Sequence, residues 1–354
     1  MFDGWGSGRR ARDRGGLRYA WGSAAGVAVL VAALALGGWL YTLWQTGVIS
    51  RRFPPGGAFV EIGGGARLHY TERTPQGRPR GTVVLLHGAS GNQADMMVPL
   101  GAPLAERGFR VLAFDRPGHG WSDRPDGEEG DASPARQAAL IADGLHRLGV
   151  ADAVVVGHSW SGALAAVFAL DHRDVTGGVV LLSPVVYPWP TGIEWYYAPA
   201  ASRWLGPAFT HIVTLPVGQL LLPAGIASVF APEPVPPRFA ERTGVELVLR
   251  PDEFENNATD VFHLHAFVTG LGPRLPDIAI PTAIVAGDSD TIAPAFFHGE
   301  RMARELPGAT IALLKGRGHS PQWSDPDVVV AAIGSVADRM GLKGTVAPSP
   351  VAAQ

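Results

Sequence analysis

The 354-residue sequence contains no cysteine. This absence excludes disulfides, thiol nucleophiles, thiolate metal sites and lipid attachment at cysteine. Charged residues are also scarce, at 17% of the chain, and the formal net charge is -3. Because the only basic cluster lies at the extreme N-terminus, nothing indicates a nucleic-acid partner. The length suffices for one α/β domain with an insertion.

One long uncharged run lies near the N-terminus, over residues 21–44. At about 1.5 Å per residue, roughly 20 helical residues cross a hydrocarbon core of about 30 Å. Trp21 and Trp44 end the run, as aromatic residues do at membrane interfaces. A cleaved signal peptide would have a shorter apolar region and a small-residue cleavage site. A buried helix of a soluble core is seldom so long and so uniformly apolar. We therefore expect an uncleaved membrane anchor.

The charges around this run are asymmetric. Five arginines precede it and two follow it: Arg9, Arg10, Arg12, Arg14 and Arg18 against Arg51 and Arg52. Since positive charge favours the cytoplasmic side, this predicts a cytoplasmic N-terminus and a main domain outside the cytoplasm.

Strand-like and helix-like segments alternate over the remainder of the chain. The later strand-like runs are continuously apolar, which is typical of parallel strands buried on both faces. The alternation predicts a doubly wound α/β fold. The expected strands are residues 59–62, 67–71, 82–86, 110–114, 153–156, 178–182, 282–286 and 310–314, and the expected helices are residues 94–107, 134–148, 161–170, 294–305 and 326–340.

The alternation is interrupted over residues 185–276, which are rich in proline and aromatic residues and lack a strand of the core type. We expect this segment to be a helical cap over the carboxyl edge of the sheet. The predicted divisions are a basic tail (1–20), the anchor (21–44), a Pro/Gly linker (45–57), the α/β core (58–184 and 277–343), the cap (185–276) and a disordered tail (344–354).

The strongest chemical signal is the run Gly157-His158-Ser159-Trp160-Ser161-Gly162, which follows an apolar strand. A serine held on a tight strand-to-helix turn needs small neighbours so that the two elements can approach each other. The turn predicts Ser159 as a nucleophile, with the backbone N–H of Trp160 as an oxyanion donor. Ser161 stands where a second glycine is usual in this motif, which makes it the alternative nucleophile.

Two further loops follow buried strands. The run His87-Gly88-Ala89 can supply a second oxyanion donor, the backbone N–H of Ala89, with His87 as a structural turn residue. Asp115 and Arg116 begin a Pro/Gly-rich loop and are expected to scaffold it rather than to react.

An activated serine needs a base and a group that orients the base. Two histidines, His298 and His319, follow the run from Gly287 to Asp290. His298 falls in the expected helix 294–305, on a solvated face, whereas His319 lies in a Gly-rich loop after the last strand. We therefore predict His319 as the base. Asp290 is the predicted acid, and Asp288 is the alternative, more simply interpreted as capping backbone amides of the turn.

Together these motifs resemble the α/β-hydrolase superfamily: the serine elbow, the His87-Gly88 turn, Asp115-Arg-Pro-Gly-His-Gly-Trp-Ser122, Gly287-Asp-Ser-Asp290 and Gly318-His319. The resemblance implies an eight-stranded sheet, a Ser-His-Asp triad and a cap between strands six and seven. Dehalogenases and epoxide hydrolases of that superfamily carry an aspartate nucleophile, so Ser159 argues against both.

The segment from Leu249 to Asp260 resembles the terminal cap helix of small-ester and carbon–carbon-bond hydrolases. That likeness implies substrate contact by Asn256 and Asn257, and the alternative is that both are amides on a helix surface. 

We thus predict a serine hydrolase that cleaves an ester-like bond of a small or medium, largely apolar substrate, without metal or organic cofactor. The alternatives are carbon–carbon-bond hydrolysis, cofactor-free perhydrolysis or acyl transfer on the same triad, and a membrane-tethered binding protein with an inert triad. The sequence does not determine the oligomeric state.

Overall fold

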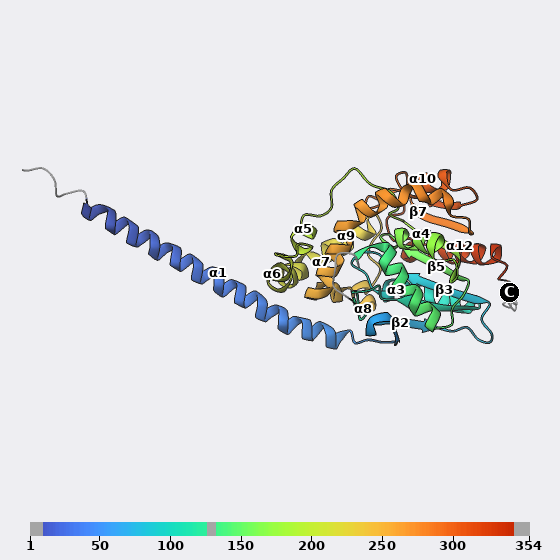
Figure 1. Ribbon diagram of the computed structural model, residues 1–354, viewed down its shortest axis with the longest axis horizontal. Coiled ribbons are helices and arrows are strands. Elements are labelled where there is room, and N and C mark those ends of the chain that lie inside the picture. Colours follow the sequence, from blue (N-terminus) through green and yellow to red (C-terminus); the bar gives the residue numbers. More distant parts are fainter. Residues whose placement is uncertain (1–9, 126–131, 343–354) are drawn as a thin grey trace, which may run out of the picture.

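The computed structural model describes residues 10–125 and 132–342. Helix α1 (Arg10–Arg52) projects as a long rod from an α/β body, as Figure 1 shows. The predicted disordered tail, residues 344–354, and the first nine residues of the predicted basic tail lie outside the described residues.

The body is built on one eight-stranded sheet in the order β1-β2-β4-β3-β5-β6-β7-β8. Strand β2 pairs antiparallel with both β1 and β4, and all other pairs are parallel. This confirms the predicted eight-stranded, mostly parallel sheet. The strands are β1 (Ala58–Glu61), β2 (Arg67–Arg73), β3 (Gly81–Leu86), β4 (Phe109–Phe114), β5 (Ala153–His158), β6 (Thr176–Leu182), β7 (Thr282–Gly287) and β8 (Thr310–Leu314).

Helices cover both faces of this sheet. Side chains of successive strand residues point to opposite faces, so Val83 and Leu85 pack with α2 (Gln93–Glu106) and α12 (Pro326–Arg339). Val84 and Leu86 pack with α3 (Pro134–Arg147), α4 (Ser161–Asp171) and α10 (Gly299–Glu305). A 3₁₀ turn, η1 (Gly63–Gly65), joins β1 to β2, and α11 (Pro321–Ser324) precedes α12.

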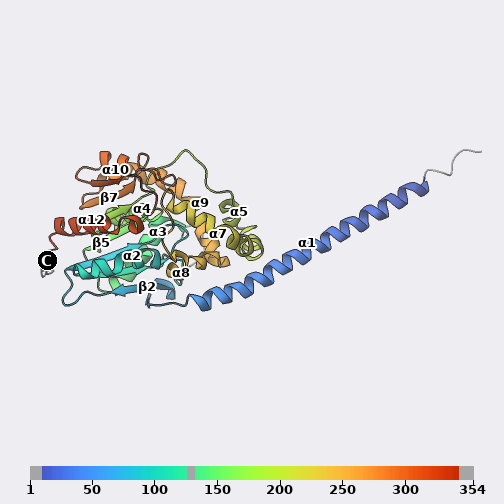
Figure 2. The ribbon, with the colours of Figure 1, turned by 180° about the vertical axis from the view of Figure 1, so that it is seen from behind.

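A helical cap is inserted between β6 and β7, as predicted. Its elements are α5 (Tyr197–Ala200), α6 (Gly206–Phe209), the π-helical turn η3 (Thr210–Thr214), α7 (Leu215–Phe230), α8 (Phe239–Thr243), η4 (Val245–Leu249), α9 (Pro251–Leu271) and η5 (Gly272–Asp277). In both views α5, α6 and α7 lie at the end of the body nearest α1 (Figures 1 and 2).

Helix α1 is longer than the predicted anchor, because it continues beyond residue 44 to Arg52. Only residues 53–57 of the predicted linker are therefore outside a helix. The extension has a packing cause: Ile49 is buried in a cluster with Leu215 and with Leu247, Val248 and Leu249 of the cap.

Two helical runs of the described chain are long and apolar enough to cross a membrane: Ala25–Arg52 and Gly206–Phe230. The first is the predicted span. The second run was predicted only as part of the cap. Its prolines and the aromatic residues around it were interpreted as features of the cap, so the long apolar helical run was not identified.

Candidate active site

Ser159 occupies the sharp turn between β5 and α4 with a φ of +54°, which L-residues rarely adopt. The turn is possible because its neighbours are small. A Cβ at Gly157 would collide with the carbonyl oxygen of Ser161, and one at Gly162 would collide with Pro184. The local sequence therefore folds as the predicted elbow.

Three side chains from separate loops meet at the carboxyl edge of the sheet. The Oγ of Ser159, after β5, lies 2.9 Å from Nε2 of His319, after β8. The Nδ1 of His319 lies 2.8 Å from Oδ2 of Asp290, after β7. All three residues are buried. The structure thus brings together the predicted nucleophile, base and acid.

The carboxyl group of Asp290 is held in its ionised form. Burial alone would raise its pKa, but the charge of His319, the hydrogen bond from its ring and two backbone donors lower the pKa to about 2. Those donors are the N–H groups of Ile292 at 2.8 Å and Ala293 at 2.9 Å, both to Oδ1. A fixed carboxylate of this kind favours the imidazole tautomer with a proton on Nδ1, which leaves Nε2 to accept the serine proton.

The alternative nucleophile and acid lie elsewhere. Ser161 is fully buried and its hydroxyl donates to the carbonyl oxygen of His87 at 2.5 Å. Asp288 accepts hydrogen bonds from the backbone of Gly316 at 2.7 Å and from the Ser289 hydroxyl at 2.8 Å. Both side chains therefore hold neighbouring loops in place: Ser161 bonds to the loop after β3, and Asp288 bonds to the loop after β8.

The expectation for His298 was wrong. Helix α10 begins only at Gly299, and His298 is 1% exposed rather than solvated. Its Nδ1 accepts a hydrogen bond from the backbone of Tyr187 at 3.4 Å. Burial lowers the pKa of His298 to about 4, so the ring is neutral and structural.

The loop after β3 lies against the nucleophile. A Cβ at Gly88 would stand 3.0 Å from the Ser159 Cβ, so any larger residue would force the elbow or this loop to shift. Within the described part of the chain, the backbone N–H groups of Ala89 and Trp160 donate to no protein acceptor. The two groups are thus available to a ligand.

Asn256 and Asn257 lie on α9 and bond to loops of the core. Asn257 is fully buried; its Oδ1 accepts from the Ser90 N–H at 2.7 Å, and its Nδ2 donates to the Ser90 hydroxyl at 3.0 Å. The Nδ2 of Asn256 donates to the carbonyl oxygen of Gly118 at 3.1 Å. Substrate contact by these amides stays a prediction.

Two residues that sequence reasoning missed lie close to His319, the predicted base. His158 lies beside the nucleophile, and its Nε2 is 2.9 Å from the carbonyl oxygen of His319. Burial and the neighbouring His319 lower the pKa of His158 to about 3, so its neutral ring donates this hydrogen bond. Asp95 lies behind it, with Oδ2 3.8 Å from His158 Nδ1 and Oδ1 accepting from Trp323 Nε1 at 2.8 Å. Burial raises the pKa of Asp95 to about 6.

Arg116 joins the cap to the elbow. Its fully buried guanidinium donates to Oδ2 of Asp260 on α9 at 2.7 Å and lies 4.0 Å from the centroid of the Trp160 ring. Arg124 donates to the other oxygen of Asp260 at 2.6 Å. Asp115 does not pair with Arg116; it contacts the His69 ring at 2.7 Å. Asp115 scaffolds its loop, as expected, by accepting the Trp121 N–H at 2.9 Å, whereas Arg116 links that loop to the cap.

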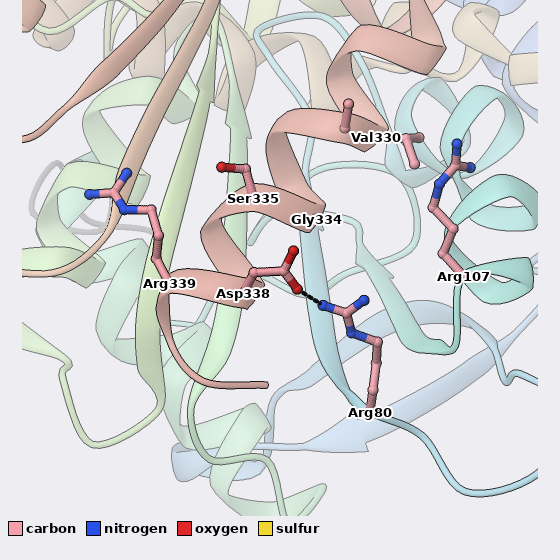
Figure 3. Close-up of a pocket in the computed structure, with 8 residues that line it drawn as sticks. Arg80, Arg107, Val330, Gly334, Ser335, Asp338 and Arg339 are labelled. Carbon is pink, nitrogen blue, oxygen red and sulfur yellow. Dashed lines mark hydrogen bonds and ion pairs between the residues drawn. The ribbon is translucent and has the colours of Figure 1, made fainter. Parts of the chain in front are cut away.

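A separate hollow lies at the opposite, amino edge of the sheet, between α12 and the start of β3. It is lined by Arg80, Arg107 and Asp338, with an ion pair of 2.6 Å between Arg80 and Asp338 (Figure 3). None of the predicted catalytic side chains reaches it. Across residues 10–125 and 132–342, no group of three or more His, Asp or Glu side chains is arranged to hold a metal ion.

Comparison with known proteins gives relatives of several activities. An epoxide hydrolase 3 of Xenopus tropicalis is 26% identical over 245 residues, which cover 65% of this chain but only 64% of that protein's length. A 2-hydroxy-6-oxononadienedioate/2-hydroxy-6-oxononatrienedioate hydrolase of Escherichia coli is 26% identical over 272 residues, covering 75% of this chain and 89% of the relative.

Among solved structures, a bacterial membrane phospholipase A superimposes with a TM-score of 0.63 at 21% identity. The superposition covers 92% of this chain and 99% of that one, so the shared fold extends over nearly the whole molecule. Residues 83–332 match the family model described as the alpha/beta hydrolase family. Fold, site geometry and this match agree, and the chain belongs to the alpha/beta hydrolase family.

Proposed function

We propose that the protein is a serine hydrolase that cleaves an ester-like bond of a small or medium, largely apolar substrate. One observation carries this proposal: the chain of contacts from Ser159 Oγ to His319 Nε2 at 2.9 Å and from His319 Nδ1 to Asp290 at 2.8 Å. A hydroxyl, an imidazole and an ionised carboxylate in this order form the arrangement that activates serine.

In the first step, the Oγ of Ser159 attacks the substrate carbonyl carbon while Nε2 of His319 accepts the hydroxyl proton. Asp290 remains ionised and stabilises the imidazolium through Nδ1–H. The backbone N–H groups of Ala89 and Trp160 donate to the oxyanion of the tetrahedral intermediate. His319 then gives its proton to the leaving alcohol, and an acyl-enzyme forms at Ser159.

In the second step, water replaces the alcohol. His319 accepts a proton from the water as the water oxygen attacks the acyl carbon, and the collapse of the second tetrahedral intermediate returns the proton to Ser159. No residue beyond those named is needed to balance the two half-reactions.

An apolar substrate is favoured by the cap and by one structural relative. Tyr196, Tyr197 and Phe254 form an aromatic cluster in the cap, with ring centroids of Tyr196 and Tyr197 4.7 Å apart. The structural relative that is a membrane phospholipase A supports an ester of a lipid as the substrate class.

We further propose that α1 anchors the protein in a membrane with its N-terminus in the cytoplasm. Five arginines precede the apolar run, whereas Arg51 and Arg52 follow it and Arg52 is already paired with Glu246 at 2.9 Å. A topology reporter fused at the C-terminus should be active outside the cytoplasm. Activity of that reporter only in the cytoplasm would overturn this orientation.

Hydrolysis of a carbon–carbon bond is the second candidate, because one relative is named as a hydrolase of oxononadienedioate-type acids. The same Ser159 and His319 would serve it. Product analysis after incubation with a vinylogous 1,5-diketone and with an aryl ester of similar size separates the two reactions. Cleavage of the diketone alone would favour the second candidate.

The decisive experiment is labelling of the full-length protein with a fluorophosphonate probe, with hydrolysis of an aryl ester measured in parallel. We expect Ser159→Ala to abolish labelling and hydrolysis, and the neighbouring variant Ser161→Ala to retain both. Labelling that persists in Ser159→Ala would remove the proposed nucleophile. A wild-type protein that neither reacts with the probe nor hydrolyses any ester would support a non-catalytic binding protein.

A further inference from the structure

The cap carries an apolar helical run that the proposed reaction does not use. Residues 206–230, which form α6, η3 and α7, contain no charged side chain. Their outer surface is open: Leu220 is 80% exposed and Leu221 is 50% exposed. Immediately before the run, Trp204 is 85% exposed. A continuous exposed apolar surface of this kind marks contact with a partner or a membrane.

This run packs directly on the C-terminal half of α1. A Cβ at Gly38 would collide with the Ile212 backbone, so glycine allows the helix and η3 to touch. The Tyr41 hydroxyl donates to Oε1 of Gln219 on α7 at 2.6 Å. Both ribbon views show α1 leaving the body on the side of the cap (Figures 1 and 2).

These contacts fix the depth of the cap relative to a bilayer. The uncharged run of α1 ends at Trp44, six residues after Gly38. At about 1.5 Å per residue, Gly38 lies about 9 Å inside that end. Helices that lie in the membrane surface bury their apolar face by about 5–10 Å. A membrane crossed by α1 therefore reaches the level of Ile212 and Gln219.

We propose that α6, η3 and α7 of the cap lie in the surface layer of the same bilayer that α1 crosses, with Trp204, Leu220 and Leu221 in contact with lipid. The inference rests on the proposed membrane anchorage by α1. The run lies on the membrane and does not cross it, because Gly206 and Phe230 at its two ends are buried against protein.

The lipid-facing run also ends beside the catalytic base. Directly after α7, Glu233 Oε2 accepts the Gly318 N–H at 2.6 Å, and a Cβ at Gly318 would collide with the Ala231 carbonyl oxygen. Gly318 immediately precedes His319. An ester dissolved in the bilayer therefore reaches the part of the cap that contacts the His319 loop. This route identifies esters carried in the lipid as the substrate class.

Depth-dependent fluorescence quenching tests this placement, and the absence of native cysteine makes labelling specific. The full chain carrying Leu220→Cys, Leu34→Cys or Leu313→Cys is labelled with an environment-sensitive dye and reconstituted into phosphatidylcholine vesicles with nitroxide-labelled lipids. Leu34 is an exposed anchor residue, and Leu313 is an exposed leucine on β8, away from the cap. We expect at least about threefold stronger quenching at positions 34 and 220 than at position 313.

Each label answers a separate question. Quenching at position 34 without quenching at position 220 would overturn the inference and leave the anchor intact. No quenching at position 34 would overturn the anchor, whatever the activity of the enzyme. A blue-shifted but unquenched label at position 220, dependent on protein density, would indicate contact between two copies of the chain and would also overturn the inference.

A kinetic comparison adds an independent readout. Leu221→Glu is compared with Leu313→Glu, since both leucines are exposed to a similar degree, 50% and 45%. We expect Leu221→Glu to slow hydrolysis of an ester embedded in vesicles by about tenfold while it leaves hydrolysis of a water-soluble short-chain ester unchanged. Leu313→Glu should change neither rate. Equal rates of Leu221→Glu and wild type on the embedded ester would contradict the inference.

Discussion

The side chain of Asn257 holds Ser90 by two hydrogen bonds, from the Ser90 N–H at 2.7 Å and to the Ser90 hydroxyl at 3.0 Å. Ser90 has a φ of +57° and directly follows Ala89, one of the two proposed oxyanion donors. A cap residue therefore fixes the backbone of a core loop next to the nucleophile. We predict that Asn257 is a positioning residue for the proposed oxyanion donor of Ala89.

This relationship predicts that Asn257→Leu lowers kcat by at least about tenfold with little change in KM, because a displaced oxyanion donor weakens transition-state binding more than substrate binding. Steady-state kinetics on an aryl ester measures the effect. Asn257→Asp keeps an acceptor for the Ser90 N–H and should retain more activity than Asn257→Leu. Thr259→Val, on the same helix, is the control and should stay within about threefold of wild type, because the Thr259 hydroxyl donates to the Glu255 carbonyl oxygen of its own helix. A rise in KM alone would instead assign Asn257 to substrate binding.

Asp290 and Asp288 should respond very differently to the same substitution. Asp290→Asn places an amide beside His319 Nδ1 and favours the wrong tautomer, so we expect kcat to fall by about 10⁴-fold. Asp288→Asn should change kcat by less than about threefold, because Asp288 bonds only to its own turn and to Gly316. Measurement of kcat for both variants at pH 7–8 shows which aspartate is the acid. A larger loss in the Asp288 variant would identify that residue as the acid.

Asp95 gives a prediction about stability and pH. Its pKa is raised to about 6 in the folded protein from an ordinary value of 3.8, so the folded state retains a proton that the unfolded state releases. Stability should therefore fall as pH rises from about 4 to about 6, by a total of about 3 kcal/mol. Asp95→Asn removes this contribution. Free energies of unfolding in detergent at pH 4–7 should show a flatter curve for the variant, and parallel curves would disprove the assignment.

The buried ion pair between Arg116 and Asp260 should stabilise the attachment of the cap. Asp260→Ala leaves the guanidinium of Arg116 buried without its charged partner. We expect this to lower the free energy of unfolding by about 3–5 kcal/mol. Asp171→Ala is the matched control, since the pair of Asp171 with Arg274 also joins core and cap but is solvent-exposed. Asp171→Ala should lower the free energy of unfolding by less than about 1 kcal/mol. Denaturant titration followed by tryptophan fluorescence measures both, and equal losses would contradict the prediction.

Local patterns in the sequence predicted the parts of the molecule that local interactions determine. Continuous apolar runs identified the strands because these strands are buried on both faces of the sheet. The turn residues around Ser159, His87 and His319 identified the loops at its carboxyl edge.

Contacts between distant parts of the chain could not be predicted in this way. Asn257 and Ser90 are separated by 167 residues, and His158 and His319 by 161. No periodicity or residue spacing in the sequence indicates such a contact. The same reason explains the end of α1, since the helix continues to Arg52 through packing of Ile49 on the cap. The same reason explains why His298 was wrongly predicted to be solvated, since its burial depends on distant parts of the chain that pack around it.

The docking of α1 on the cap has a consequence for any attempt to produce a detergent-free form of the protein. A chain shortened to begin after Arg52 would uncover Leu215 and Leu247 to Leu249, which Ile49 shields in the intact molecule. Such a fragment should self-associate in buffer, and a foreign single-pass helix of equal length would not restore its solubility. The N-terminal helix is therefore a structural part of the α/β body as well as its proposed membrane anchor.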